Sequence, residues 1–257
     1  MAKLTEWLNK HNEQIVTETK RRPMNTSVKP DAGQQRSTLI ELPFPARSTV
    51  ADTLVSAYNN ELRNPAQTVF VLDKSGSMAG KRMESLRSIL TEPVDGSART
   101  RTGPVGLRNR EEVSIIAFDN RPATPFKARY STTQPAENQQ LRAHITALTP
   151  GGATAIYDSL QLVYQQFPAT QPGGQRSIPS IVLMSDGASN TGATFDEFSR
   201  FYAGLSPEKK RIPVFVILYG EANKNEMNQL ATMTGGKTFD ATSGALAEAF
   251  KEIRGYQ

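Results

Sequence analysis

Cysteine is absent from this chain of 257 residues. Disulfides and thiolate metal sites are therefore excluded. Histidine is nearly as scarce, with His11 and His144 the only two, so a zinc site or another soft-metal site is not expected. A chain without cysteine suits either a cytosolic or an extracytoplasmic bacterial protein, and the redox compartment stays open on this ground.

Long apolar runs are also missing. Apolar residues make up 37% of the chain and the mean hydropathy is −0.46. No stretch approaches the roughly 20 apolar residues of a membrane span, and the opening Met-Ala-Lys-Leu-Thr-Glu lacks the apolar core of a signal peptide. We therefore expect no direct membrane insertion, and any export signal or anchor would lie outside this sequence.

Basic residues exceed acidic ones, giving a net charge of +5 and a pI of about 9.4. They gather near residues 20–22, 99–110 and 209–211. Aromatic residues are not interleaved with these clusters, as a single-strand nucleic-acid binder would need. The pattern favours a solvated surface, and we expect no nucleic-acid partner.

Short apolar runs recur from residue 68 onward, at 68–72, 113–118, 181–184 and 214–218. Continuous runs of this kind are typical of strands buried on both faces of a parallel sheet. Helical patterns separate and follow them, at 80–91, 137–147, 155–167, 195–203, 224–233 and 243–254.

This alternation predicts an α/β fold with a doubly wound, Rossmann-like, mostly parallel six-stranded sheet and helices on both faces. Residues 122–132 are expected to supply one antiparallel edge strand. Residues 93–111, rich in proline, glycine and arginine, are expected to form a surface excursion. The length fits one large domain with a small appendage.

The first part of the chain has a different pattern. Residues 4–20 predict a helix that ends before Pro23, and residues 23–38 predict a loop. Pro43 and Pro45 bracket an extended segment. A further helix is expected over 50–62, capped by Ser48 or Thr49.

The strongest chemical pattern is Asp73-Lys74-Ser75-Gly76-Ser77, directly after the strand at 68–72. Ligands of open α/β sheets bind outside the carboxyl ends of the strands. Gly76 lets the backbone bend, so that both hydroxyls can point to a common centre beside the Asp73 carboxylate.

Two further segments carry similar groups. Thr154 follows Gly151 and Gly152 ahead of a predicted helix, and Asp186 follows the strand at 181–184. Carboxylate and hydroxyl oxygens are hard ligands, suited to Mg²⁺, Mn²⁺ or Ca²⁺. Other acids near strand ends are assigned to loops: Asp119 to a turn, Asp158 to the surroundings of the site or the surface, and Asp240 to a loop.

Together the three motifs resemble the metal-ion-dependent adhesion site of von Willebrand factor A domains, over roughly residues 46–257. The resemblance implies that Ser75, Ser77 and Thr154 touch the metal, with Asp73 and Asp186 close by, directly or through water. All five positions match. It also implies that a carboxylate from a partner protein, or water, fills the last coordination position.

Residues 1–45 resemble the tail of a periplasmic solute-binding-like domain that precedes such a domain in some bacterial surface proteins. This predicts a boundary between an N-terminal helix and arm, residues 1–45, and an A domain, residues 46–257. It also predicts an extracytoplasmic protein, at the cell surface or membrane-anchored in its full length.

The leading hypothesis is therefore a monomeric, metal-dependent protein-binding or adhesion module without enzymatic activity. The site motifs contain no base, and no Ser-His-Asp pattern or nucleotide-binding loop is present. One alternative is an intracellular A domain that assists an ATPase in complex assembly. Another is a Mg²⁺-dependent phosphohydrolase, although Ser75 stands where such a site would need an acid.

Overall fold

The computed structural model describes residues 6–7, 10–11, 14, 47–100, 103–104, 106–132, 135–167, 177–187, 189–219, 223–241 and 252–253. The chain divides into two units, residues 1–51 and 52–257. In the first unit, Glu6, Trp7, Lys10 and Gln14 are helical, within the helix expected over 4–20. The predicted loop at 23–38 and the extended segment after it lie outside the described residues, as does most of the predicted helix at 243–254.

The second unit is built on one six-stranded sheet in the order β5-β4-β1-β6-β7-β8. The five parallel strands are β1 (Ala66–Asp73), β4 (Glu112–Phe118), β6 (Ile178–Ser185), β7 (Val214–Leu218) and β8 (Thr238–Asp240). At one edge β5 (Phe126–Arg129) runs antiparallel to β4. The predicted fold class, with its single antiparallel edge strand, is confirmed.

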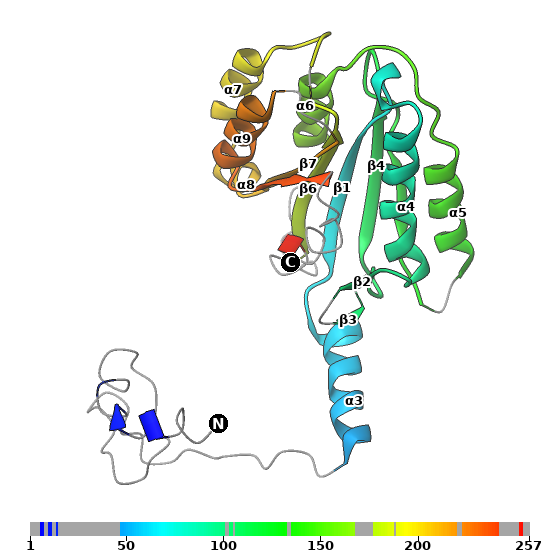
Figure 1. Cartoon of the computed structure of the whole chain (residues 1–257), viewed down its shortest axis with the longest axis vertical. Coiled ribbons are helices and arrows are strands. Elements are labelled where there is room, and N and C mark those ends of the chain that lie inside the picture. The colour runs from blue at the N-terminus through cyan, green and yellow to red at the C-terminus, as the bar shows by residue number, and fades with distance from the viewer. Residues whose placement is uncertain are drawn as a thin grey trace. The chain divides into compact units, whose positions relative to one another are not determined.

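Helices cover both faces of this sheet (Figure 1). One face carries α4 (Lys81–Asp95) and α5 (Pro135–Thr146), and the other carries α6 (Ile156–Gln166), α7 (Phe195–Ala203) and α9 (Lys224–Met233). The remaining elements are α3 (Ser48–Ala57) with its continuation η2 (Tyr58–Leu62), η3 (Gly76–Met78), α8 (Pro207–Lys210) and the two-residue strands β2 (Arg99–Thr100) and β3 (Gly103–Pro104).

The central strands supply both halves of the core by alternation. In β1, Val69 and Val71 join the apolar cluster under α6, α7 and α9, whereas Phe70 and Leu72 join the cluster under α4 and α5. Strand side chains point alternately to opposite faces. A strand covered on both faces is therefore apolar at every position, which is the pattern that the sequence shows.

Two expectations about the ends of helices were wrong. Helix α4 runs through Pro93 to Asp95, beyond the predicted end at residue 91, and the excursion starts only after Gly96. The Pro93 side chain is buried in the last turn and its carbonyl accepts from the N–H of Leu107 at 3.1 Å. Burial of Pro93 and Val94 against the core offsets the one helical hydrogen bond that proline lacks. Helix α3 begins at Ser48, two residues earlier than predicted.

No helix within the described ranges is long and apolar enough to cross a membrane.

Phe198 of α7 tests the packing of the aromatic side chains in the cluster under α6, α7 and α9. It is fully buried, and its ring contacts those of Tyr157, Tyr164, Phe201 and Tyr202. Replacing Phe198 with alanine should lower the free energy of unfolding by about 3–5 kcal/mol, because it removes a large side chain from a closed core. Urea denaturation measures the change.

The matched control is Phe201→Ala on the same helix, because Phe201 is only half-buried. Its loss should cost clearly less than that of Phe198. Equal losses for the two variants would contradict the assignment of Phe198 to the centre of the core.

Candidate metal centre

The site begins with the Asp73 carboxylate at the end of β1. Leu72 of β1 lies opposite Met184 of β6 in the parallel register, so the next residues, Asp73 and Ser185, are neighbours at the same sheet edge. The Ser185 hydroxyl donates to Asp73 Oδ2 at 2.5 Å, and the N–H of Ser75 donates to Oδ1 at 2.8 Å. Asp73 is completely buried. Its carboxylate is therefore held in one orientation by two elements.

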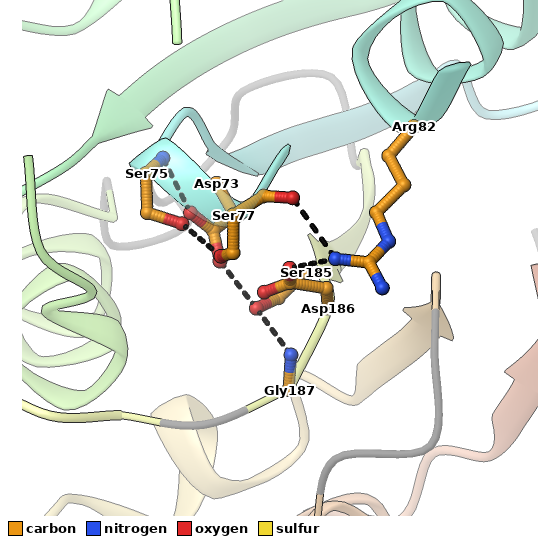
Figure 2. A network of polar contacts seen from close by, with 7 residues as sticks. All are labelled: Asp73, Ser75, Ser77, Arg82, Ser185, Asp186 and Gly187. Carbon is orange, nitrogen blue, oxygen red and sulfur yellow. Dashed lines mark hydrogen bonds and ion pairs between the residues drawn. The ribbon is translucent and has the colours of Figure 1, made fainter. Parts of the chain in front are cut away.

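The two serine hydroxyls come together on the loop after β1. Ser75 Oγ and Ser77 Oγ lie 3.1 Å apart (Figure 2). Ser75 directly precedes the single 3₁₀ turn η3, Ser77 lies within it, and the completely buried Met78 anchors its end. Ser75 is buried and Ser77 is exposed, so the pair leads from the carboxylate to the surface.

The loop that carries Thr154 lies directly against this one. The N–H of Gly76 donates to the carbonyl of Gly152 at 3.0 Å, and the N–H of Gly151 donates to the carbonyl of Lys74 at 2.7 Å. Thr154 itself is 3% exposed. The described hydrogen bonds bring its backbone to this sheet edge but do not join its hydroxyl to the other four predicted residues.

Two asparagine side chains fix the same loop from either side. The N–H of Ala153 donates to Asn120 Oδ1, and the N–H of Thr154 donates to Asn190 Oδ1, both at 2.8 Å. Asn190 comes from the segment after β6 and Asn120 from the turn after β4. Sequence reasoning did not find this role of either asparagine, because nothing in their spacing marks them as partners of a distant loop.

Asp186 lies at the other side of the site and forms an ion pair with the Arg82 side chain. Arg82, near the start of α4, donates from Nη1 to Asp186 Oδ2 at 2.8 Å and to the carbonyl of Ser77 at 2.9 Å (Figure 2). Sequence reasoning missed Arg82, which is 104 residues from Asp186 in the chain. It also gave no role to Ser185, although Ser185 stands inside the motif that supplied Asp186.

The other acids near the strand ends have structural partners. Asp119 forms an ion pair with Lys74, whose hydrogen bond holds the pKa of the Asp119 carboxyl below its ordinary value. Asp158 accepts from the N–H of Ala193 at 3.0 Å, and Asp240 pairs with Lys224 at 3.1 Å. The contacts of Asp119 and Asp158 agree with the turn and surrounding roles that the sequence predicted for them. Asp240, expected in a loop, is instead the last residue of β8.

The electrostatics of Asp73 bear on whether a metal fits. Burial raises the pKa of the Asp73 carboxyl above its ordinary value, the hydrogen bonds from Ser185 and Ser75 oppose this, and the nearby charge of Asp186 adds to it. Both hydrogen-bond donors to Asp73 are neutral, so its negative charge is not balanced by them. A buried carboxylate in this state favours a cation beside it.

The donor set matches a hard cation. Within the described part of the chain, no group of three or more His, Cys, Asp or Glu side chains could hold a metal ion. The oxygens gathered here are instead two carboxylates and two hydroxyls, the chemistry of Mg²⁺, Mn²⁺ or Ca²⁺ sites. The residues therefore fit such an ion, and the hydroxyls would supply part of its coordination.

These features define an α/β domain that carries a hydroxyl-rich acidic site on the loops at the carboxyl edge of a doubly wound sheet. The sequence model of the von Willebrand factor type A domain matches residues 68–252. The chain belongs to this family, whose members are metal-dependent adhesion and protein-interaction modules.

Relatives share only part of their length with this chain. The inter-alpha-trypsin inhibitor heavy chain H3 of Mesocricetus auratus is 27% identical over 174 residues, which are 66% of this chain and 18% of that protein. The collagen alpha-5(VI) chain of Mus musculus is 27% identical over 173 residues, which are 66% of this chain and 6% of that protein. The chain thus spans less than a fifth of either relative.

Solved structures agree on the fold. A von Willebrand factor type A structure from Catenulispora acidiphila has a TM-score of 0.53 at 16% identity, covering 74% of this chain and 42% of that one. The pilus adhesin SpaC of Lactobacillus rhamnosus GG has a TM-score of 0.52 at 14% identity, covering 76% of this chain and 31% of that one.

Gly152 offers a test of the loop packing. Its φ is +79°, and an added Cβ would lie 3.0 Å from Asp119 Cβ. Gly152→Ala should cost about 1–2 kcal/mol for the left-handed backbone alone, and more if Asp119 cannot move. Thermal denaturation measures the loss.

Gly151→Ala is the control, because a Cβ there would meet nothing within 4 Å. It should leave the free energy of unfolding nearly unchanged. A Gly152 variant as stable as the Gly151 variant would show that the described loop conformation is wrong.

The raised pKa of Asp73 predicts a pH dependence in metal-free protein. Between the unfolded and folded pKa values the folded state binds more protons, so stability falls as pH rises through this window and stays low above it. Asp73→Asn removes the buried charge and should be more stable than the parent in chelator at neutral pH. Melting curves should show this advantage shrinking as the pH falls into the carboxylate range. An advantage that is constant with pH, or absent, would contradict the assignment.

Proposed function

We propose that this chain is a non-enzymatic, metal-dependent protein-binding or adhesion module. In this proposal one Mg²⁺, or Mn²⁺ or Ca²⁺ in its place, sits at the carboxyl edge of the sheet and binds an acidic side chain of a partner protein. The proposed metal-binding residues are Asp73, Ser75, Ser77, Thr154 and Asp186. The observation that carries the proposal is the buried Asp73 carboxylate, held by neutral donors beside two converging hydroxyls.

The chemistry of these donors suits partner binding. Hydroxyl ligands are neutral, so only the two carboxylates compensate the charge of a divalent ion. Mg²⁺ prefers octahedral coordination and retains water molecules. A partner Asp or Glu that replaces one of these waters gains a direct ionic contact, while the site residues keep the ion in place.

Support for a partner of this kind comes from the position of the donors. Ser77 is exposed, whereas Asp73 and Ser75 are buried beneath it. An ion bound among them would be reached from the Ser77 side. Among the relatives, SpaC is named a pilus adhesin, and the family consists of interaction modules.

A phosphohydrolase is less well supported. Such a site would use Lys74 to bind phosphate, but the Lys74 side chain is paired with Asp119. His144 is stacked on Phe126 of β5 with ring centroids 4.3 Å apart, and no described hydrogen bond joins it to the Asp73 loop. The described groups therefore favour binding over acid–base chemistry.

The cellular location belongs to the same proposal. Residues 1–45 resemble the end of a solute-binding-like domain, and one similar structure is a pilus adhesin. We place the full-length protein outside the cytoplasm, at the surface or anchored to a membrane. An intracellular role beside an ATPase is the alternative, and the upstream reading frame would decide between the two.

Asp73→Ala tests the function directly. It should lower Mg²⁺ or Mn²⁺ affinity by at least 10–100-fold, the scale of losing a group that orients a metal ligand. The fold should persist, because the sheet and the apolar clusters on its two faces remain. Calorimetric titration of the full chain measures the affinity, and circular dichroism checks the fold.

Asp196→Ala on α7 is the control, because Asp196 is an exposed acid near the start of a helix and takes no part in the site. Its metal affinity should equal that of the parent chain. Parent protein that binds neither ion, or an Asp73 variant that binds as well as the control, would refute the proposed function.

A further inference from the structure

Arg82 is an unexpected group in a site proposed to hold a cation. It is the second residue of α4, where the positive end of the helix dipole disfavours a cation. Its guanidinium is nevertheless held against Asp186 and the Ser77 carbonyl through Nη1. The contact with Asp186 opposes this unfavourable effect.

The guanidinium is only partly used by these contacts. The Arg82 side chain is 46% exposed and that of Asp186 is 10% exposed. Arginine carries five N–H donors in a planar fork, and the described contacts of Arg82 involve Nη1. Nε and Nη2 lie on the side away from Ser77 and Asp186 (Figure 2).

The charges around the site give Arg82 a consequence for metal binding. Lys74 is neutralised by Asp119, so the ion would meet the carboxylates of Asp73 and Asp186 together with one guanidinium. Arg82 offsets half of the negative charge of these two acids. A divalent ion then leaves the site with excess positive charge, which an added carboxylate relieves.

Resting on the function proposed above, we propose that Arg82 is the residue that makes this site selective for an acidic partner. It competes with the metal for Asp186, which weakens binding of the metal alone. Its charge also leaves the metal-loaded site with excess positive charge, which attracts the partner carboxylate that binds the metal. The acidic group is thus attracted by the ion and by the charge of the guanidinium together.

Competition for Asp186 and attraction of the partner carboxylate predict opposite effects of one substitution. In Arg82→Gln, Mn²⁺ alone should bind about tenfold tighter, because a like charge leaves its neighbourhood. Acetate, used as the carboxylate probe on Mn²⁺-loaded protein, should bind several-fold more weakly. Calorimetry of the full chain measures the first effect. Water-proton relaxation measures the second, because acetate displaces water from bound Mn²⁺.

Two further variants separate charge from geometry. Lys81→Gln removes the same charge from the adjacent residue, which is exposed and does not contact Asp186, and it should change both affinities far less. Arg82→Lys keeps the charge, so both affinities should stay near those of the parent chain.

The outcomes distinguish this inference from the function on which it rests. If the parent chain fails to bind Mn²⁺, the proposed function is wrong. If the parent binds Mn²⁺ but Arg82→Gln binds it no tighter than Lys81→Gln, or more weakly, Arg82 merely orients Asp186 and the inference fails. Unchanged acetate binding in Arg82→Gln overturns it as well.

Discussion

The site depends on one buried carboxylate that receives only neutral hydrogen bonds. The Asp73 side chain is taken out of water at the end of β1, and the Ser75 N–H and the Ser185 hydroxyl offset part of that cost. The rest of its charge is left for a cation. Because one donor comes from its own loop and the other from β6, the carboxylate keeps its position only while β1 and β6 are paired in their observed register. The central pairing of the sheet is therefore also a constraint on the site.

The surrounding loops are fixed by contacts that require no ion. Backbone hydrogen bonds join Gly76 to Gly152 and Lys74 to Gly151. The side chains of Asn120 and Asn190 accept from the next two N–H groups of the same loop. A site whose loops are already ordered loses little conformational entropy on binding. In the same arrangement the acid proposed to hold the ion is buried, whereas the side chains of Ser77 and Arg82 are exposed. Selectivity can then reside at the rim without disturbing the buried donor.

The sheet and its covering helices were largely predictable because their signals are local. Four apolar runs matched β1, β4, β6 and β7, and the predicted helices at 195–203 and 224–233 coincide with α7 and α9. Burial on two faces leaves a continuous apolar run, and burial on one helical face leaves a repeat of 3.6 residues. The predicted end of α4 was wrong because proline normally stops a helix, and only the packing of Pro93 against the core reverses that preference. The four-residue α8 was missed, being too short for a repeat to show.

By itself the sequence determined the fold class and placed five oxygen-bearing candidates on loops that follow or precede core elements. It could do so because hydrophobic repeats and short motifs are properties of neighbouring residues. Only the tertiary structure decided what these candidates contact: that Ser185 holds Asp73 and that Arg82 binds Asp186. These pairs join residues more than a hundred positions apart. They form because strand register and helix packing bring their backbones together, and neither is encoded in any single stretch of the chain.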